Sequence, residues 1–216
     1  MKKLELMIFD LDGTLIDSGK DLIDGVNGML KSMGLQQKAA EEIKRYIGDG
    51  VVKLVERALG VPNLHRLEEA LAVFSDYYGK HFLDNTVLCD GVEDVLRAFP
   101  KTPKVILTNK SSFFSLAIVR GLGIEKYFEE IIGADSMPFL KPDPRQIEYL
   151  LEKYRARREN TLMIGDGKND ILAAKNSGIL SLALLNGLGD RRMLLELKAD
   201  YYCETIREMV SLFEGR

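Results

Sequence analysis

Apolar and polar residues alternate along the chain in blocks that predict strands and helices in turn. Short, almost wholly apolar runs are typical of strands buried in a parallel sheet. Such runs lie at Leu4–Phe9, Val105–Leu107, Ile131–Gly133, Thr161–Ile164, Leu180–Leu185 and, more weakly, Tyr201–Cys203. Helix-like segments lie between most of them, at Val92–Phe99, Phe113–Leu122, Arg145–Tyr154 and Ile171–Asn176. This alternation predicts an α/β protein with a doubly wound parallel sheet.

Residues 16–85 interrupt the alternation, because they contain no convincing strand. Apolar residues recur there at helical spacing, first at Leu22, Ile23, Val26, Met29, Leu30 and Met33, and then at Leu67, Leu71, Phe74 and Tyr78. Val51–Leu59 predicts another short helix. Methionine and aromatic stripes most often serve packing. We therefore expect a helical domain at 16–85, inserted into a core domain of residues 1–15 and 86–216 through hinges at Ile16–Ser18 and Asn85–Val87.

Composition narrows the possible partners and the compartment. The 216 residues are 46% hydrophobic and 29% charged, with a formal net charge of −3 and no basic patch, so we expect no nucleic-acid partner. No apolar stretch approaches the roughly 20 residues of a membrane span, so we expect no membrane partner. Cys89 and Cys203 lie far apart, and we expect buried free thiols. These features predict a cytoplasmic protein.

An acidic pair directly follows the first predicted strand. Asp10 and Asp12 stand there, followed by Gly13, which permits a sharp turn. Carboxylates at the end of a buried strand oppose packing, and such a pair usually persists because a cation or a reacting group neutralises it. The alternative is a solvated Asp-Gly turn that closes a hairpin. The pair therefore favours a functional site, and the hairpin stays open.

Three further polar loops are expected to follow predicted strands in the same way. They are Thr108-Asn109-Lys110, Lys141-Pro142-Asp143-Pro144 and Gly165-Asp166-Gly167-Lys168-Asn169-Asp170. Ligands of an open parallel sheet bind beyond the carboxyl ends of its strands, so these loops can converge on Asp10 and Asp12. Carboxylate oxygens with few nitrogen or sulfur ligands suit Mg²⁺, which takes part of its shell from a phosphate. Lys141 and Thr108 would then hold the remaining phosphate oxygens.

Each of these residues also has a plainer explanation. Thr108 is explained equally well as a residue that ends a strand, and Lys141 as a solvated loop lysine. Asp166 and Asp170, at the start of a predicted helix, could simply complement the helix dipole. Four polar loops in this order, all beside strand ends, favour one common site over separate explanations.

The ordered set resembles the four motifs of the haloacid dehalogenase superfamily. The motifs are Asp10-Leu11-Asp12-Gly13-Thr14, Thr108-Asn109, Lys141-Pro142 and Gly165-Asp166 with Asp170. The resemblance spans the whole chain and implies a Rossmann-like core with a mobile α-helical cap inserted after the first motif. In the cap, the segment from Ile47 to Leu59 resembles the Gly-x-Gly-x-x-x-Leu segment of phosphoglycolate phosphatases. Gly167 stands where those phosphatases usually carry a serine.

The resemblance implies a role for each acidic motif residue. Asp10 would attack phosphorus to form an aspartyl phosphate, and Asp12 would serve as general acid and then as general base. Mg²⁺ would be held by the carboxylates of Asp10 and Asp166 and by the main-chain carbonyl of Asp12. Asp170 would complete the metal site by orienting a water of the ion's shell.

The same resemblance implies the residues that bind substrate. Thr108 and Lys141 would stabilise charge on the transferring phosphoryl group, and Asn109 would contact the substrate. Gly48 and Gly50 of the cap would approach it through their main chain.

The predicted function is Mg²⁺-dependent hydrolysis of a small phosphorylated metabolite, most like that of a phosphoglycolate phosphatase. A pyrophosphatase, a sugar-phosphate phosphatase and a phosphomutase stay open. A dehalogenase and a phosphonate hydrolase of the superfamily are disfavoured because neither needs Asp12. A catalytically idle phosphate-binding module is disfavoured by the intact set of motif residues. We expect a monomer or a homodimer.

Overall fold

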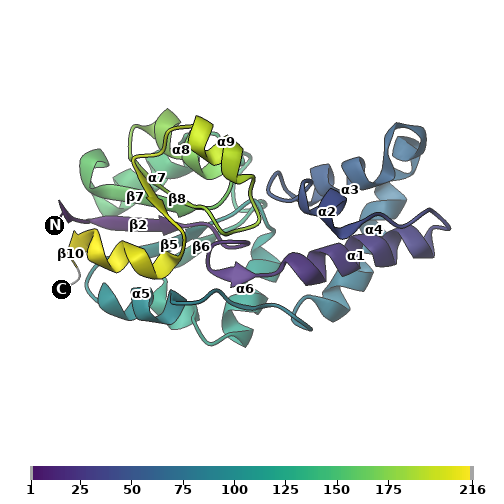
Figure 1. Cartoon of the computed structure of the whole chain (residues 1–216), viewed down its shortest axis with the longest axis horizontal. Coiled ribbons are helices and arrows are strands. Elements are labelled where there is room, and N and C mark those ends of the chain that lie inside the picture. Colours follow the sequence, from purple (N-terminus) through teal and green to yellow (C-terminus); the bar gives the residue numbers. More distant parts are fainter. Residues whose placement is uncertain (1, 215–216) are drawn as a thin grey trace.

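A six-stranded parallel sheet forms the centre of the core in the computed structural model, which describes residues 2–214 (Figure 1). The strand order is β6-β5-β2-β7-β8-β9, and each neighbouring pair is parallel. The strands are β2 (Leu6–Phe9), β5 (Lys104–Leu107), β6 (Glu130–Ile132), β7 (Thr161–Gly165), β8 (Leu180–Leu184) and β9 (Tyr201–Cys203). The doubly wound α/β fold predicted from the sequence is confirmed.

The order of connections places β2 at a switch point of the sheet. After β2 the chain adds β5 and β6 on one side, and it then returns to add β7, β8 and β9 on the other. The loops after β2, β5 and β7 therefore leave neighbouring strands at one edge. In open α/β sheets such a point opens a crevice beyond the carboxyl ends of the strands.

Helices cover both faces of the sheet. On one face, Met7 and Phe9 pack in an apolar cluster with residues of α5 (Val92–Ala98) and α6 (Ser112–Gly121). On the other face, the alternate residues Leu6 and Ile8 pack with residues of α7 (Arg145–Tyr154) and α8 (Lys168–Ser177). The alternation follows from the strand period of two. It explains why β2 is buried along its whole length.

Shorter elements complete the core. They are α9 (Arg191–Glu196), the 3₁₀ turns η2 (Glu125–Tyr127), η3 (Arg158–Asn160) and η4 (Ile206–Ser211), and the parallel pair β1 (Lys2–Lys3) and β10 (Phe213–Glu214). This last pair joins the two ends of the described chain, at the side of the core remote from α1 (Figure 1).

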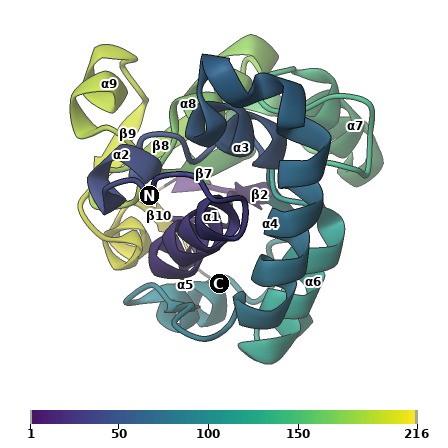
Figure 2. The same cartoon turned by 90° about the vertical axis from the view of Figure 1, so that its right-hand side faces the viewer.

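The helices between residues 19 and 81 form a second body beside the core, which we call the cap (Figures 1 and 2). It consists of α1 (Gly19–Ser32), α2 (Ala40–Lys44), α3 (Val51–Leu59), η1 (Val61–Arg66) and α4 (Leu67–His81). Its helices share an apolar cluster of their own, which includes Val26, Met29, Val55 and Phe74. The predicted domain borders at 15/16 and 85/86 stay a prediction, and residues 1, 215 and 216 of the core range lie outside the described chain.

Two chain segments cross between core and cap, and they are hydrogen-bonded to each other. The short strands β3 (Ile16–Asp17) and β4 (Val87–Leu88) pair antiparallel. The buried Asp21 carboxylate in the first turn of α1 accepts hydrogen bonds from the N–H and amide of Asn85 and from the N–H and hydroxyl of Thr86. The first cap helix is thus tied to the segment that returns to the core.

The expectation that Lys141 follows a strand was wrong. Residues 133–144 form a loop after β6, and Leu140 before Lys141 is 38% exposed. Pro138, Pro142 and Pro144 lack the N–H that a strand in mid-sheet would donate, which explains the irregular backbone. Lys141 therefore reaches the sheet edge by another route, described below.

Two smaller expectations also bear on the fold. Cys89 and Cys203 are both free, as predicted, but only Cys203 is fully buried, whereas Cys89 is half-buried. No helix within residues 2–214 combines the length and the apolar character needed to cross a membrane.

Candidate active site

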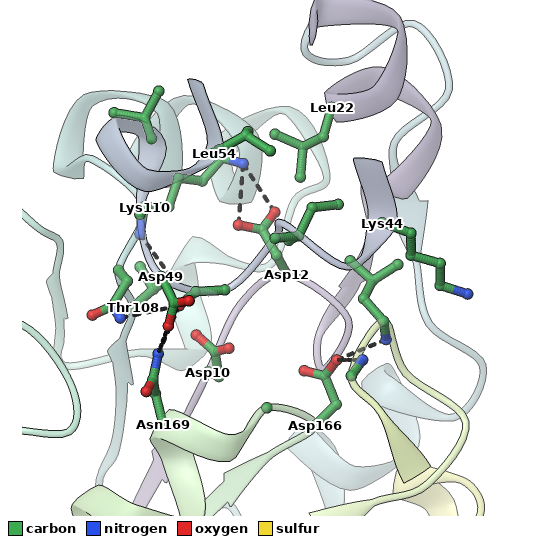
Figure 3. Close-up of a pocket in the computed structure, with 18 of the residues that line it drawn as sticks. Asp10, Asp12, Leu22, Lys44, Asp49, Leu54, Thr108, Lys110, Asp166 and Asn169 are labelled. Atoms are coloured by element: carbon green, nitrogen blue, oxygen red, sulfur yellow. Dashed lines mark hydrogen bonds and ion pairs between the residues drawn. The ribbon is translucent and has the colours of Figure 1, made fainter. Parts of the chain in front are cut away.

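A cavity of about 720 Å³ lies where the carboxyl edge of the sheet faces the cap. Its walls include eight of the nine residues that the sequence singled out: Asp10, Asp12, Gly48, Gly50, Thr108, Asn109, Asp166 and Asp170. Figure 3 shows the carboxylates of Asp10, Asp12 and Asp166 in this space. The ninth residue, Lys141, is not among the lining residues, but its ammonium contacts two of these carboxylates.

The residues converge because their loops prolong neighbouring strands. The Asp10 N–H donates to the Ile164 carbonyl of β7 at 2.9 Å, one step beyond the last paired residue of β2. The Thr108 N–H donates to the Ile132 carbonyl of β6, also at 2.9 Å. The sheet ladder thus fixes the backbone on which both side chains stand. Their positions follow from strand order rather than from contacts between the side chains.

Asp10 lies in a buried acidic cluster with one ammonium group. Carboxylate oxygens of Asp10, Asp166 and Asp170 lie within 4.8 Å of one another. The Lys141 ammonium is 2.7 Å from Asp10 and 2.6 Å from Asp170, with its side chain 2% exposed. Burial and the charge of Asp170 raise the pKa of Asp10 to about 7, although Lys141 opposes the rise. Burial lowers the pKa of Lys141, but Asp10 and Asp170 outweigh it and raise the pKa overall.

Asp166 is fixed by donors that the sequence analysis did not assign. The Thr14 hydroxyl donates to Oδ1 at 2.8 Å, and the N–H groups of Leu188 and Gly189 donate to Oδ2 at 2.7 and 3.2 Å. Burial and Asp170 still raise the pKa of Asp166 to about 6. The carboxylate lies against Gly13, where a Cβ would come within 2.1 Å of it and where φ is +82°. Glycine is therefore required at this turn.

The donor set fits a hard divalent cation. The three carboxylates, of which Asp10 is half-buried and the other two are buried, share one ammonium. Burial and then the charge of Asp170 raise the pKa values of Asp10 and Asp166. An all-oxygen set matches the ligand preference of Mg²⁺ or Ca²⁺. The predicted role of Asp170 stays a prediction, since its two oxygens already accept from Lys141 and from the Gly167 N–H.

Asp12 stands apart from this cluster and has its own cation. Its carboxylate accepts from the Ser18 hydroxyl at 2.5 Å and from the Lys110 ammonium at 2.9 and 3.2 Å. Burial lowers the pKa of Lys110, but Asp12 and Tyr78 outweigh it and hold the pKa above its ordinary value. The two aspartates of the first motif thus have separate lysines.

Asn109 connects three loops. Its amide nitrogen donates to the carbonyls of Gly48 at 3.1 Å and Lys141 at 3.0 Å, and its amide oxygen accepts from the Lys141 N–H at 2.9 Å. These contacts place Lys141 at the sheet edge even though no strand precedes it. The predicted contact of Asn109 with substrate stays a prediction, as does that of the buried Thr108.

The cap reaches the core through the loop at 48–50. Asn169 donates to the Gly48 carbonyl at 3.1 Å and to the Asp49 carboxylate at 2.7 Å (Figure 3). Gly50 has a φ of +87°, and a Cβ there would lie 3.3 Å from the Asn109 carbonyl oxygen. The loop therefore rests on the core in this conformation and closes one side of the cavity.

Some residues that contact the carboxylates of the site were not predicted from the sequence, and they differ in how clearly the sequence indicates them. Thr14 and Lys110 stand inside motif segments, so their spacing could have pointed to them. Ser18 lies in a predicted hinge, and Leu188 contributes only a backbone N–H. A backbone donor can come from any residue type, so no sequence pattern identifies it.

Known proteins resemble this chain over most of its length. A family model described as haloacid dehalogenase-like hydrolase matches residues 7–184. The phosphoglycolate phosphatase of Vibrio parahaemolyticus is 32% identical over 97% of this chain and 96% of that protein. The phosphoglycolate phosphatase of Neisseria gonorrhoeae is 34% identical over 90% of this chain and 85% of that protein.

A solved structure extends the likeness to the fold. The crystal structure of a predicted phosphoglycolate phosphatase from Haemophilus somnus 129pt has a TM-score of 0.89 and 27% sequence identity. The match covers 98% of this chain and 99% of that one. The likeness therefore includes the core and the cap.

Proposed function

Since the chain belongs to the haloacid dehalogenase-like hydrolase family, we propose that it is a Mg²⁺-dependent phosphatase that works through a phosphorylated Asp10. One observation carries the proposal: Asp10 lines the cavity while its carboxylate lies within a cluster of two further carboxylates and a lysine. A nucleophile needs access to substrate together with neighbours that control its charge. Asp10 has both.

The first half of the reaction transfers the phosphoryl group to the enzyme. An Asp10 carboxylate oxygen forms a bond to phosphorus while the bond from phosphorus to the ester oxygen breaks. Asp12 gives its proton to the departing oxygen, so that an alcohol leaves. Lys141 and Thr108 would stabilise negative charge on the phosphoryl oxygens.

The second half restores the enzyme. A water oxygen bonds to phosphorus, the bond between phosphorus and Asp10 breaks, and Asp12 takes a proton from the water. Asp10, Asp166 and the main-chain carbonyl of Asp12 would hold Mg²⁺, with Asp170 supporting the site. When bound, the ion would offset the negative charge of phosphate and carboxylates in this buried cluster.

We propose a small phosphate monoester such as 2-phosphoglycolate as the substrate. The names of the similar proteins support this choice, as does the Gly48-x-Gly50-x-x-x-Leu54 segment of the cap. A cavity of about 720 Å³ has room for larger esters, so sugar phosphates are the proper competitors. Pyrophosphate and a phosphomutase reaction complete the set of alternatives.

The test is a substrate panel with Mg²⁺: 2-phosphoglycolate, several sugar phosphates, pyrophosphate and p-nitrophenyl phosphate. The proposal expects phosphate release with the highest kcat/KM on a small monoester. Preference for pyrophosphate or conversion of one sugar phosphate into its isomer would replace the substrate proposal. No release from any ester, by protein whose folding has been verified, would overturn the phosphatase proposal itself.

A further inference from the structure

Lys110 is a buried cation that the reaction outlined above does not use. It lies two residues after Thr108 in the loop that follows β5, and its side chain is 7% exposed. Its ammonium lies 2.9 Å from Oδ1 and 3.2 Å from Oδ2 of Asp12. A buried charge is costly unless it is paired, so this contact is a strong constraint on both side chains.

Asp12 is held mainly through one of its two oxygens. Oδ1 accepts from the Ser18 hydroxyl and has the shorter contact with Lys110, whereas Oδ2 has only the longer one among the described residues. Ser18 lies immediately before α1, and Lys110 belongs to the core. The carboxylate therefore bridges the hinge and the core, with Oδ2 the less engaged oxygen.

The cap limits where the Lys110 ammonium can go. The ammonium lies 5.0 Å from the centre of the Tyr78 ring, a distance at which a cation is attracted to an aromatic face. Tyr78 comes from α4, is 2% exposed, and stacks on Phe74 at 5.3 Å. The Lys110 ammonium thus contacts both a buried ring of the cap and the Asp12 carboxylate.

We propose that Lys110 is a positioning residue for proton transfer by Asp12, an inference that rests on the proposed phosphatase function. With Ser18 it holds Oδ1, and this leaves Oδ2 as the oxygen that exchanges the proton with the leaving group or the water. Because Tyr78 packs on the same ammonium, the position of Asp12 depends on the cap being in place. A well-placed acid contributes about 10²–10⁴ to rate, so partial misplacement has a measurable effect.

The test uses the dependence of kcat/KM on the leaving group, because kcat/KM covers the steps up to loss of the alcohol. Lys110→Met keeps the length of the side chain and removes the charge. We expect a loss of at least about 10-fold on an alkyl phosphate, whose alkoxide needs a proton. On p-nitrophenyl phosphate, whose leaving group needs none, we expect a loss of less than about 3-fold.

Controls separate positioning from a general loss of structure. Lys104→Met removes another buried lysine, at the start of β5, whose ammonium donates only to the carbonyls of Phe99 and Thr102 among the described residues. It should lower stability without changing the leaving-group dependence. Lys110→Arg keeps a cation and should recover part of the activity on the alkyl ester. In an Asp12→Asn background, Lys110→Met should cost little further kcat/KM.

Equal losses on both esters would overturn the inference, and so would an undiminished loss in the Asp12→Asn background. Either result would mean that Lys110 acts on the fold or directly on the substrate. If Lys110→Met does not fold, Lys110→Arg is the deciding variant. Reduced activity of Lys110→Arg with the leaving-group dependence of the wild type would also contradict the positioning role. Failure of the wild-type protein to hydrolyse any ester would instead count against the proposed function.

Discussion

The core and the cap meet at one cavity but contribute different chemistry to it. The core provides the acidic cluster with Lys141 and the separate pair of Asp12 and Lys110. The cap provides apolar side chains such as Leu22, Leu54 and Phe74, the charged side chains of Glu41, Lys44 and Arg45, and the loop at 48–50. Groups that must be placed accurately thus stand on loops fixed by the sheet, whereas the cap forms the wall opposite.

The two regions therefore have different functions at the cavity. The sheet ladder fixes the backbone of the core loops on adjacent strands, so the placement of Asp10 and Thr108 does not depend on the cap. Asp12 differs, because the Lys110 ammonium that holds it also contacts the cap ring of Tyr78. The polar contacts that tie the cap to the core include those at Asn109 and Asn169, the ion pair of Lys168 with Asp49, and the hinge around Asp21. We therefore expect core substitutions to abolish chemistry, and cap substitutions to change which substrate is used.

The largest effect is expected from Asp10→Asn. Turnover should fall by at least about 10⁴-fold, because an amide cannot form the acyl phosphate. Circular dichroism should show an unchanged fold, since the amide has nearly the shape of the carboxylate. Substantial activity that survives after deamidation has been excluded would remove Asp10 as the nucleophile.

The same variant should also change how the stability of the fold depends on pH. The folded pKa of Asp10 is raised to about 7, above its ordinary value, so ionisation of Asp10 costs folded-state stability as the pH rises. Without metal, the wild type should lose this contribution progressively up to about pH 7, whereas Asp10→Asn should not. Thermal unfolding at pH 5 and pH 8 should show the variant gaining relative to wild type. No relative gain would contradict the raised pKa.

Metal removal is the next test of the core. Exhaustive chelation should abolish turnover and Mg²⁺ should restore it, because the carboxylate cluster needs a cation to offset its charge. Ca²⁺ should inhibit, since it accepts more ligands and could engage both oxygens of Asp10. Mg²⁺ should also raise the unfolding temperature of the wild type but not that of Asp166→Asn. Full activity after chelation would refute the metal assignment.

Substitutions in the cap loop should change selectivity. Valine at Gly50 is strained at φ +87° and meets the Asn109 carbonyl, so kcat/KM on 2-phosphoglycolate should fall by about 10²-fold. Gly48→Val, at φ +108° with nothing within 4 Å, should cost less. Both should affect p-nitrophenyl phosphate less than the small ester.

Gly34→Val is the matched control for the cap loop. Gly34 has a φ of +69° and nothing within 4 Å, and it does not line the cavity. The variant should have the same kind of backbone strain but no effect at the cavity, so it should keep the substrate preference. If Gly48→Val and Gly50→Val reduce both substrates in equal proportion while staying folded, the loop has no part in selection.

The smallest effect is expected at the hinge. Asp21→Asn should lower the free energy of unfolding by about 1–3 kcal/mol at pH 7, because the donors of Asn85 and of the buried Thr86 lose a charged acceptor. Asp24→Asn on the same helix, where the carboxylate is exposed, should have little effect. Urea unfolding measures both. Equal effects would mean that the hinge contacts add no stability.

The pH dependence of this hinge has the opposite sign to that of Asp10. Burial pushes the pKa of Asp21 up, but the hydrogen bonds from Asn85 and Thr86 outweigh it and lower the pKa below its ordinary value. The stabilisation is therefore present above that ordinary value and is lost as the pH falls through the folded pKa. The difference between wild type and Asp21→Asn should shrink in strong acid. A difference that grows there would contradict the assignment.

The sequence predicted those parts of the site that stand directly after strands. Asp10, Thr108 and Asp166 could be placed because buried strands have a clear apolar pattern and polar residues at their ends oppose packing. The sequence also predicted that Lys141 joins these residues, but the expectation that it directly follows a strand was wrong. Its position depends on Asn109, which lies far away in sequence.

Other features have no sequence signal of their own. The Leu188 N–H that fixes Asp166 belongs to a residue of ordinary apolar type. The pairing of Lys110 with Asp12 rather than with the acidic cluster depends on side-chain geometry. Strand borders also shifted, as at β2, which begins at Leu6 although Leu4 is apolar, because hydrogen-bonded pairing, not hydropathy, decides where a strand begins.

The most direct test of the account is to look for a phosphoryl group on Asp10. Asp12→Asn should still accept a phosphoryl group from p-nitrophenyl phosphate, but it should hydrolyse the phosphoenzyme slowly, because the base for the water is missing. Acid quench within one turnover, followed by peptide mass spectrometry, should place the phosphoryl group on Asp10, with a burst of p-nitrophenol that precedes phosphate release. A wild type that turns over while this variant shows no phosphoryl group on Asp10, or shows it on another residue, would contradict the account.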